Sequence, residues 1–206
     1  MFLTNKITYR QAEIVVIETD ETPETLKTRL SNFREYEDEL KNIGLKKRLR
    51  EFLGVRCGVN QLFKENVKVI YHADGKPYLR DKNESISISH SGKFIALITH
   101  PVLLSGIDIE VPSKKVMKVA SRFLSEKERS YLVDEQSVAI AWSAKEALYK
   151  IIGKEAIDFA ATLEIQPFNV ESSGELLIRF IKDGQDFQIA YEMNDRYTLA
   201  YCLDNF

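Results

Sequence analysis

The stretch Gly106-Ile107-Asp108-Ile109-Glu110 lies just past the middle of the 206-residue chain and alternates isoleucine with carboxylates. On an extended strand, side chains two residues apart point the same way, so the two carboxylates share one face and the two isoleucines share the other. Like charges held that close repel each other unless a cation neutralises them or they share a proton. The stretch therefore predicts a strand that carries a hard-metal site or a proton-sharing dyad. The ordinary alternative is an edge strand with a solvated acidic face.

The composition around this stretch is that of an ordinary globular protein, with 44% hydrophobic and 29% charged residues. Because 29 Lys and Arg nearly balance 31 Asp and Glu, no basic field favours nucleic acid as the main partner. The two cysteines, Cys57 and Cys202, lie far apart, and this favours a reducing compartment. The first residues, Met1 to Lys6, lack the pattern of a signal peptide, and no uncharged run approaches the roughly 20 residues that cross a bilayer. We therefore expect a cytoplasmic protein that binds neither membranes nor nucleic acid.

Hydrophobic periodicity predicts a mixture of helices and short strands in the first half of the chain. Lys46 to Arg50 carry four positive charges in five residues, which indicates a solvated helix face or an anchor for a phosphate. His90 lies at the corner of a predicted hairpin between two serines, where it is either a surface residue or part of an anion-binding corner. The predicted strands are 7–18, as one strand or a hairpin, 67–71, 85–89 and 94–99, and the predicted helices are 24–44, in one or two pieces, and 46–63.

The second half continues with helices and ends in an antiparallel meander. Ser125 and Glu128 have the spacing of a capping box, and Gly153 is expected to end the longest helix. On that helix Glu146 and Lys150 lie one turn apart on one face, a spacing that is also typical of a surface ion pair. The predicted helices are 115–123, 125–132 and 135–152, and the predicted strands are 162–165, 174–180, 187–191 and 197–202.

Five motifs occur in a fixed order: G-K-P-Y-L from Gly75, S-I-S-H-S-G from Ser87, G-I-D-I-E from Gly106, F-L-S-x-x-E from Phe123 and W-S-A-K-E-A-L-Y-K from Trp142. Together they resemble the 4′-phosphopantetheinyl transferases of the Sfp type. The resemblance covers a little over a third of the chain. It implies an enzyme that transfers the phosphopantetheine arm of coenzyme A to a serine hydroxyl of an apo acyl or peptidyl carrier protein. Adenosine 3′,5′-bisphosphate is the implied second product.

The resemblance also implies an α+β fold in which two similar α/β halves form a pseudo-dimer within one chain. The active site would lie in the cleft between the halves. Residues 1–105 would form the N-terminal half that binds the coenzyme A nucleotide, and residues 106–206 would form the C-terminal half with the metal and the catalytic residues. The coarse repetition of helices followed by strands agrees with two halves, and the lack of a Gly- or Ser-rich linker favours tight packing between them. A monomer is the default expectation.

Residue by residue, the resemblance implies a magnesium site formed by Asp108, Glu110 and Glu146. Glu146 would also be the base that takes the proton of the carrier serine, alone or through a metal-bound water. Lys150 would offset the charge on the leaving bisphosphate and contact coenzyme A. The division of roles among the three carboxylates stays open, because groups around one ion titrate together.

The other implied coenzyme A contacts come from the first half. Lys76 and Pro77 match the segment that contacts adenine, Ser89 and His90 match the corner that holds phosphate, and Arg50 matches a basic residue at the 3′-phosphate, with Arg48 as the alternative register. The carrier protein would be acidic. Exposed cations after the metal motif suit its docking, with Met117 or Phe123 as an apolar anchor; these cations are Lys114, Lys115, Lys118 and Arg122.

Two other classes of function compete with this interpretation. A non-catalytic module that only binds coenzyme A or a nucleotide predicts a damaged metal site, whereas all the acidic residues of the motifs are present. A metal-dependent phosphohydrolase would ordinarily need more ligands, often histidines, and the chain has only His72, His90 and His100. The type of carrier protein, and whether acyl-coenzyme A is accepted, do not follow from the sequence.

Overall fold

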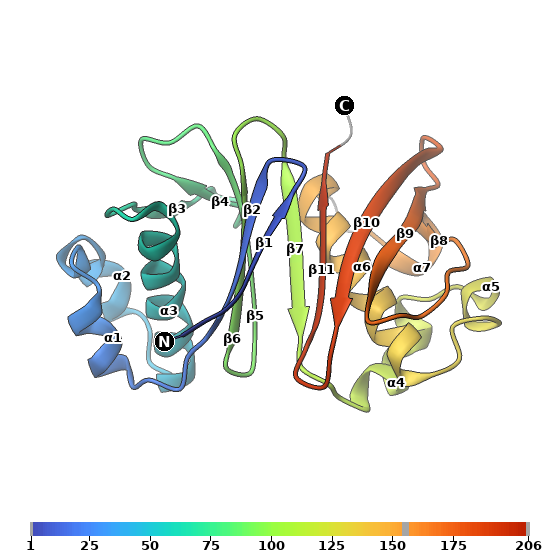
Figure 1. The fold of residues 1–206 in the computed structure, drawn as a ribbon, viewed down its shortest axis with the longest axis horizontal. Helices are drawn as coiled ribbons and strands as arrows, with labels where there is room; N and C mark the ends of the chain where they lie inside the picture. Colours follow the sequence, from blue (N-terminus) through green and yellow to red (C-terminus); the bar gives the residue numbers. More distant parts are fainter. Residues whose placement is uncertain (1, 154–156, 205–206) are drawn as a thin grey trace. The chain divides into compact units, whose positions relative to one another are not determined.

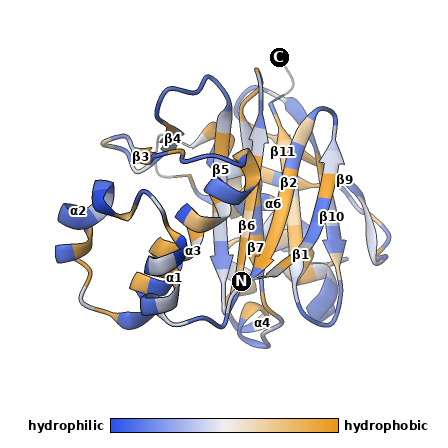
Figure 2. Ribbon diagram, turned by 60° about the vertical axis from the view of Figure 1, so that its left-hand side comes forward, coloured by the Kyte–Doolittle hydropathy of each residue, from blue (hydrophilic) through white to orange (hydrophobic). Residues whose placement is uncertain are grey.

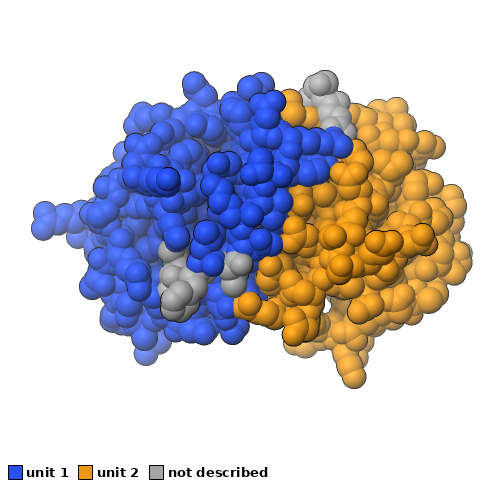
Figure 3. Space-filling view, viewed as in Figure 1, with its two compact units in different colours: residues 1–102 blue, residues 103–206 orange. Residues whose placement is uncertain are grey.

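Groups of antiparallel strands and groups of helices follow one another along the chain, so the predicted mixed α and β structure is confirmed (Figure 1). The computed structural model describes residues 2–153 and 157–204; Met1, residues 154–156 and residues 205–206 lie outside the described part. The chain divides into two compact units, residues 1–102 and residues 103–206 (Figure 3). The pseudo-dimeric relation of the halves and the roles assigned to residues 1–105 and 106–206 remain predictions.

Unit 1 is built on a four-stranded antiparallel sheet in the order β1-β2-β6-β5. The central strands β2 and β6 are rich in β-branched and aliphatic residues, and every residue of β6 is buried. Figure 2 shows β2 as a largely hydrophobic strand. A separate two-stranded ribbon pairs β3 with β4. The strands are β1 (Phe2–Tyr9), β2 (Ala12–Glu18), β3 (Val69–Tyr71), β4 (Pro77–Leu79), β5 (Ser85–Ser91) and β6 (Phe94–His100).

The helices of unit 1 include one long element, α3, which packs on β6. The helical stretch predicted between Glu24 and Gly44 consists of three short pieces, because the chain turns after Leu30, whose backbone is extended. Thr22 caps the first of these pieces by accepting a hydrogen bond from the Thr25 amide at 3.3 Å. The helices are α1 (Pro23–Arg29), η1 (Phe33–Tyr36), α2 (Glu37–Lys41) and α3 (Lys46–Phe63).

Unit 2 contains a five-stranded antiparallel sheet in the order β7-β11-β10-β9-β8. The predicted meander is therefore confirmed. Pairing of β7 with β11 was not predicted, and it places Asp108 opposite Ala200. The strands are β7 (Ser105–Glu110), β8 (Leu163–Ile165), β9 (Ser173–Phe180), β10 (Gln185–Met193) and β11 (Thr198–Leu203).

The long helix α6 packs against β7, β11 and β10, along one face of this sheet (Figure 1). Its predicted ends are confirmed: Asp134 caps the first turn, and Gly153 is the C-cap. The capping box at Ser125 is also confirmed. None of the helices in residues 2–153 and 157–204 combines the length and the hydrophobicity needed to span a membrane. The helices of unit 2 are α4 (Lys115–Val119), η2 (Ala120–Arg122), α5 (Glu126–Arg129), α6 (Glu135–Ile152) and α7 (Phe159–Thr162).

Candidate active site

Strand β7 and helix α6 are in backbone contact at Gly106. A Cβ atom added at this position would lie 2.0 Å from the carbonyl oxygen of Ala147, well inside the contact distance that any side chain tolerates. Glycine is therefore required for the helix to lie this close to the strand. Since side chains on a strand repeat every two residues, Asp108 and Glu110 lie on the same face as Gly106, toward α6.

Asp108 is 5% exposed and contacts a cation from the helix. Lys150 Nζ lies 3.1 Å from Asp108 Oδ1 and also donates a hydrogen bond to the carbonyl oxygen of Ile107 at 2.6 Å. The alternative interpretation of a solvated acidic face is therefore wrong for Asp108, which is buried. Glu110 on the same face is half-buried. Lys150 links the helix to the strand, which distinguishes it from the lysine of an ordinary surface pair within one helix.

Glu146 lies one helical turn before Lys150 and is half-buried. Burial, and after it the negative charges of Asp108 and Glu110, raise the pKa of Glu146 to about 7 against the opposing effect of Lys150. The structure thus brings the three carboxylates predicted from the sequence close enough to interact electrostatically. A carboxyl group that titrates near neutral pH can accept a proton from a substrate hydroxyl.

The donor set fits a hard divalent cation, because three carboxylates supply oxygen ligands and lose their mutual repulsion when a cation binds. The carboxylates are not assembled as a finished metal cluster: within residues 2–153 and 157–204, no group of three His, Cys, Asp or Glu side chains is already arranged to hold a metal ion. The ammonium group of Lys150 supplies the nearby positive charge at Asp108. Binding of magnesium to Asp108, Glu110 and Glu146 is consequently a proposal.

In unit 1, two of the predicted coenzyme A contacts meet at the turn between β5 and β6. Gly92 forms this turn with a φ of 60°, a conformation that favours glycine. Arg50 Nη2 donates to the carbonyl oxygen of Gly92 at 3.4 Å, and His90 Nδ1 lies 3.7 Å from Oε1 of Glu51. His90 is exposed, whereas its neighbour Ser89 is buried, as expected for successive residues of a strand.

Two further predicted contacts, Lys76 and Pro77, lie where the loop of the β3–β4 ribbon enters β4. The Lys76 amide donates to Asp74 Oδ1 at 3.0 Å, and Pro77 begins β4. Both residues are half-buried, and β4 packs beside β5. Near them the His72 ring stacks on Tyr78 with a centroid distance of 4.3 Å, which leaves an aromatic surface next to the predicted adenine segment.

No role was predicted for Lys145, the residue before Glu146. The structure buries Lys145 completely and pairs it with Glu128, which is also fully buried. A signal was present in the sequence, because Lys145 follows Ala141 by four residues and precedes Leu148 by three, on the apolar face of the helix. A lysine at such a position requires a partner.

Mutually interacting carboxylates on a strand and a helix in backbone contact, with a lysine beside them, define an acidic site suited to metal-assisted phosphate chemistry. Residues 105–202 match the sequence model of the 4′-phosphopantetheinyl transferase superfamily. This segment is a little under half of the chain and includes Asp108, Glu110, Glu146 and Lys150. The match supports assignment to the superfamily and, in general terms, a transferase of the phosphopantetheinyl group. A search of curated proteins found no significant match.

Proposed function

We propose that the protein is an Sfp-type 4′-phosphopantetheinyl transferase, which moves the phosphopantetheine arm of coenzyme A to a serine of an apo carrier protein. The observation that carries this proposal is the superfamily match over residues 105–202. This segment contains the carboxylates and the lysine that meet between β7 and α6. Adenosine 3′,5′-bisphosphate is the other product.

In the proposed reaction, the serine oxygen forms a bond to the β-phosphorus of coenzyme A, and the bond from that phosphorus to the bridging oxygen breaks. Glu146 would take the serine proton, because it is the carboxylate on the face of α6 that also carries Lys150. Lys150 lies on the adjacent turn and stabilises the negative charge that develops on the leaving bisphosphate.

Asp108, Glu110 and Glu146 would hold the magnesium ion. When bound, the ion would neutralise the pyrophosphate of coenzyme A. Asp108 would serve both groups, because it is one of the residues that would hold the ion and its Oδ1 lies 3.1 Å from Lys150 Nζ. The proposed magnesium dependence therefore couples the metal to the position of Lys150.

Coenzyme A would bind with its nucleotide on unit 1. Arg50 and His90 would hold the 3′-phosphate, a role supported by their positions at the same hairpin turn. Arg50 is preferred over Arg48, because Arg48 is exposed and Arg50 reaches the turn. Ser89 would support this corner, and Lys76 and Pro77 would contact the adenine.

An acidic carrier protein would dock on the α4 surface, which we define as the four exposed cations around α4 together with Met117. Met117 is 38% exposed and can serve as the apolar anchor. Phe123 was the other predicted anchor, and this prediction is wrong because Phe123 is 1% exposed and belongs to the core of unit 2. The four cations are Lys114, Lys115, Lys118 and Arg122.

Mass spectrometry tests the proposed activity. Apo carrier proteins of the fatty-acid, polyketide and nonribosomal-peptide types are each incubated with the protein, coenzyme A and magnesium, and we expect at least one to gain the mass of phosphopantetheine. Asp108→Ala and Glu146→Gln should each abolish this gain. No gain with any carrier would contradict the proposal, and free phosphopantetheine without a modified carrier would indicate a phosphohydrolase instead.

A further inference from the structure

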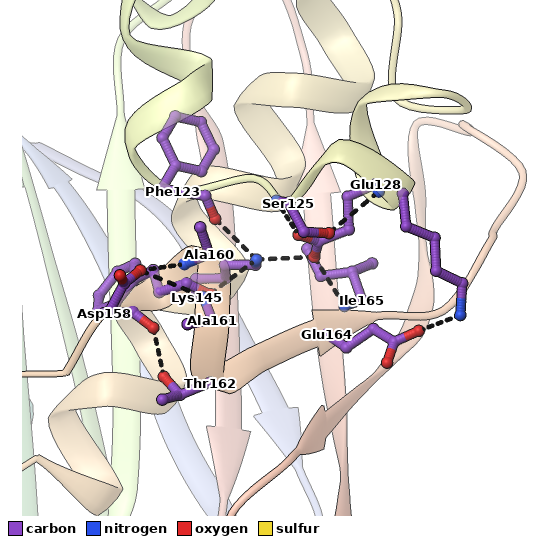
Figure 4. Close-up of polar contacts among 12 residues, drawn as sticks. Phe123, Ser125, Glu128, Lys145, Asp158, Ala160, Ala161, Thr162, Glu164 and Ile165 are labelled. Carbon is purple, nitrogen blue, oxygen red and sulfur yellow. Dashed lines mark hydrogen bonds and ion pairs between the residues drawn. The ribbon is translucent and has the colours of Figure 1, made fainter.

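Lys145 is held by a complete set of hydrogen bonds inside unit 2 (Figure 4). Its Nζ atom contacts Oε1 of Glu128 at 2.7 Å and the carbonyl oxygens of Phe123 at 2.8 Å and Phe159 at 3.2 Å. An ammonium group has three N–H donors, so each donor has an acceptor. These contacts tie α6 to η2, α5 and α7.

Glu128 is equally well satisfied at the other end of the ion pair. Its Oε1 accepts a hydrogen bond from the Ile165 amide at 2.9 Å, and its Oε2 accepts one from the Ser125 amide at 2.7 Å. Ser125 Oγ in turn accepts from the Glu128 amide at 3.2 Å, which completes the capping box. One buried carboxylate therefore connects the start of α5, the strand β8 and the helix α6.

A buried ion pair of this kind adds little net stability. Removing two charges from water is costly, and apolar residues of similar size are often as stabilising or more so. A well-packed pair of leucine and methionine could fill this region of the core. The ion pair differs from such a pair in being directional, because its hydrogen bonds fix both the position and the orientation of the lysine.

The directional contacts matter because of where Lys145 lies on α6. Successive residues of a helix are about 100° apart, so Lys145 and Ala147 point to nearly opposite sides, with Glu146 between them. Ala147 contacts the backbone of β7 at Gly106, and Lys145 is held by Glu128 on the other side. The two contacts fix the rotation of α6 about its axis, and this rotation sets the direction of Glu146.

We propose that the Lys145–Glu128 ion pair positions Glu146 for phosphopantetheinyl transfer by fixing the rotation of α6. This inference rests on the proposed function. The Glu146 carboxylate lies roughly 6 Å from the helix axis, so a rotation of about 10° displaces it by about 1 Å. A displacement of that size can lower a catalysed rate about 100-fold. Lys145 is thus a positioning residue that acts through Glu146.

The test compares two variants with a control in the same core. In Lys145→Met/Glu128→Gln both charges are removed together, and in Glu128→Asp the carboxylate is kept but shortened. We expect kcat to fall about 10- to 100-fold in the double variant and less in Glu128→Asp, with KM for coenzyme A changed less than about threefold. The control Ile178→Val creates a small cavity at another fully buried residue of unit 2 and should leave kcat unchanged.

A folded double variant with kcat within about threefold of the wild-type value would overturn the inference. So would failure of both variants to fold, because the pair would then serve stability. If the wild-type protein transfers nothing, the proposed function fails.

Crystal structures of the same variants test the positioning role separately from the transfer activity. We expect the Lys150–Asp108 contact to lengthen and the Glu146 carboxylate to shift in these variants. An unchanged position of α6 and of Glu146 would refute the positioning role of the Lys145–Glu128 pair.

Discussion

At the scale of single residues, the site depends on how Asp108, Glu146 and Lys150 share charge. Asp108 is buried and contacts Lys150, whereas burial and two neighbouring carboxylates raise the pKa of Glu146 to about 7. The carboxylates that suit metal binding and proton transfer therefore lower the free energy of unfolding when no metal is present. Substitution of Glu146 should raise the free energy of unfolding of the metal-free protein, and substitution of Lys150 should lower it.

The first prediction concerns Glu146 and the pH dependence of stability. Its pKa is raised from 4.5 in the unfolded chain to about 7 in the folded protein, so the free energy of unfolding falls as the pH rises through this window. Glu146→Gln removes the ionisation and should stabilise the metal-free protein by about 2 kcal/mol at pH 8, with no gain below pH 4. Urea unfolding in the presence of a chelator measures this difference.

The control for this experiment is Glu126→Gln, which changes an exposed carboxylate on α5. We expect this control to have no stabilising effect that grows with pH. If Glu146→Gln gives the same stability difference at pH 4 and at pH 8, the raised pKa is wrong.

The second prediction concerns Lys150. Lys150→Met leaves the buried Asp108 without its ion-pair partner, and should destabilise the metal-free protein by about 2 kcal/mol. Millimolar magnesium should restore part of this loss, because an ion that binds only the folded state raises the free energy of unfolding. Thermal unfolding with and without magnesium measures both effects. An equal response of wild type and variant to magnesium would contradict the proposed link between Lys150 and the metal.

At the scale of elements, the approach of α6 to β7 determines the geometry of the site. The third prediction is that Gly106→Ala destabilises unit 2 by about 3 kcal/mol, because its Cβ atom would overlap the carbonyl oxygen of Ala147 and push the helix away. The displaced helix should also lower the rate of transfer. Gly44→Ala is the matched control, since nothing lies within 4 Å of a Cβ atom there. Equal stability of the two variants would refute this account.

The elements that form the contact between α6 and β7 could be predicted from the sequence, but their partners could not. Helical periodicity and end signals gave both ends of α6, and alternation gave β7 and the strands of the meander. Pairing of β7 with β11 could not be predicted, because it joins segments far apart in the sequence and no local pattern encodes it. Lys145 was overlooked for a similar reason: its partner Glu128 lies in another helix, and only the packing of the two elements makes the pair visible.

At the scale of the whole molecule, charge is distributed unevenly even though the net charge is only −2. The α4 surface gathers exposed lysines on one short helix and the segments around it. Such a patch can accelerate and orient the binding of an acidic partner without contributing much to the stability of the fold.

The fourth prediction tests this patch. Lys115→Glu combined with Lys118→Glu should raise KM for the carrier protein at least about tenfold and leave KM for coenzyme A unchanged. Lys41→Glu combined with Lys64→Glu makes the same charge change on exposed residues of unit 1 and should alter neither constant. Steady-state kinetics with both substrates decide the matter, and equal effects on the two KM values would rule out a docking role.

The order of strands in unit 2 also has a consequence for how the protein folds. β9 and β10 are joined by a short turn, whereas the pairing of β7 with β11 joins the first and the last strand of the unit in chain order. Loops that close over many residues are slow to form, so we expect the β9–β10 hairpin to be protected early in refolding and β7 to be protected late. Pulsed hydrogen exchange would test this order, and early protection of β7 would contradict it. The strand that carries Asp108 and Glu110 would then be among the last to dock. During refolding these two carboxylates would approach Glu146 only after the rest of unit 2 has folded around α6.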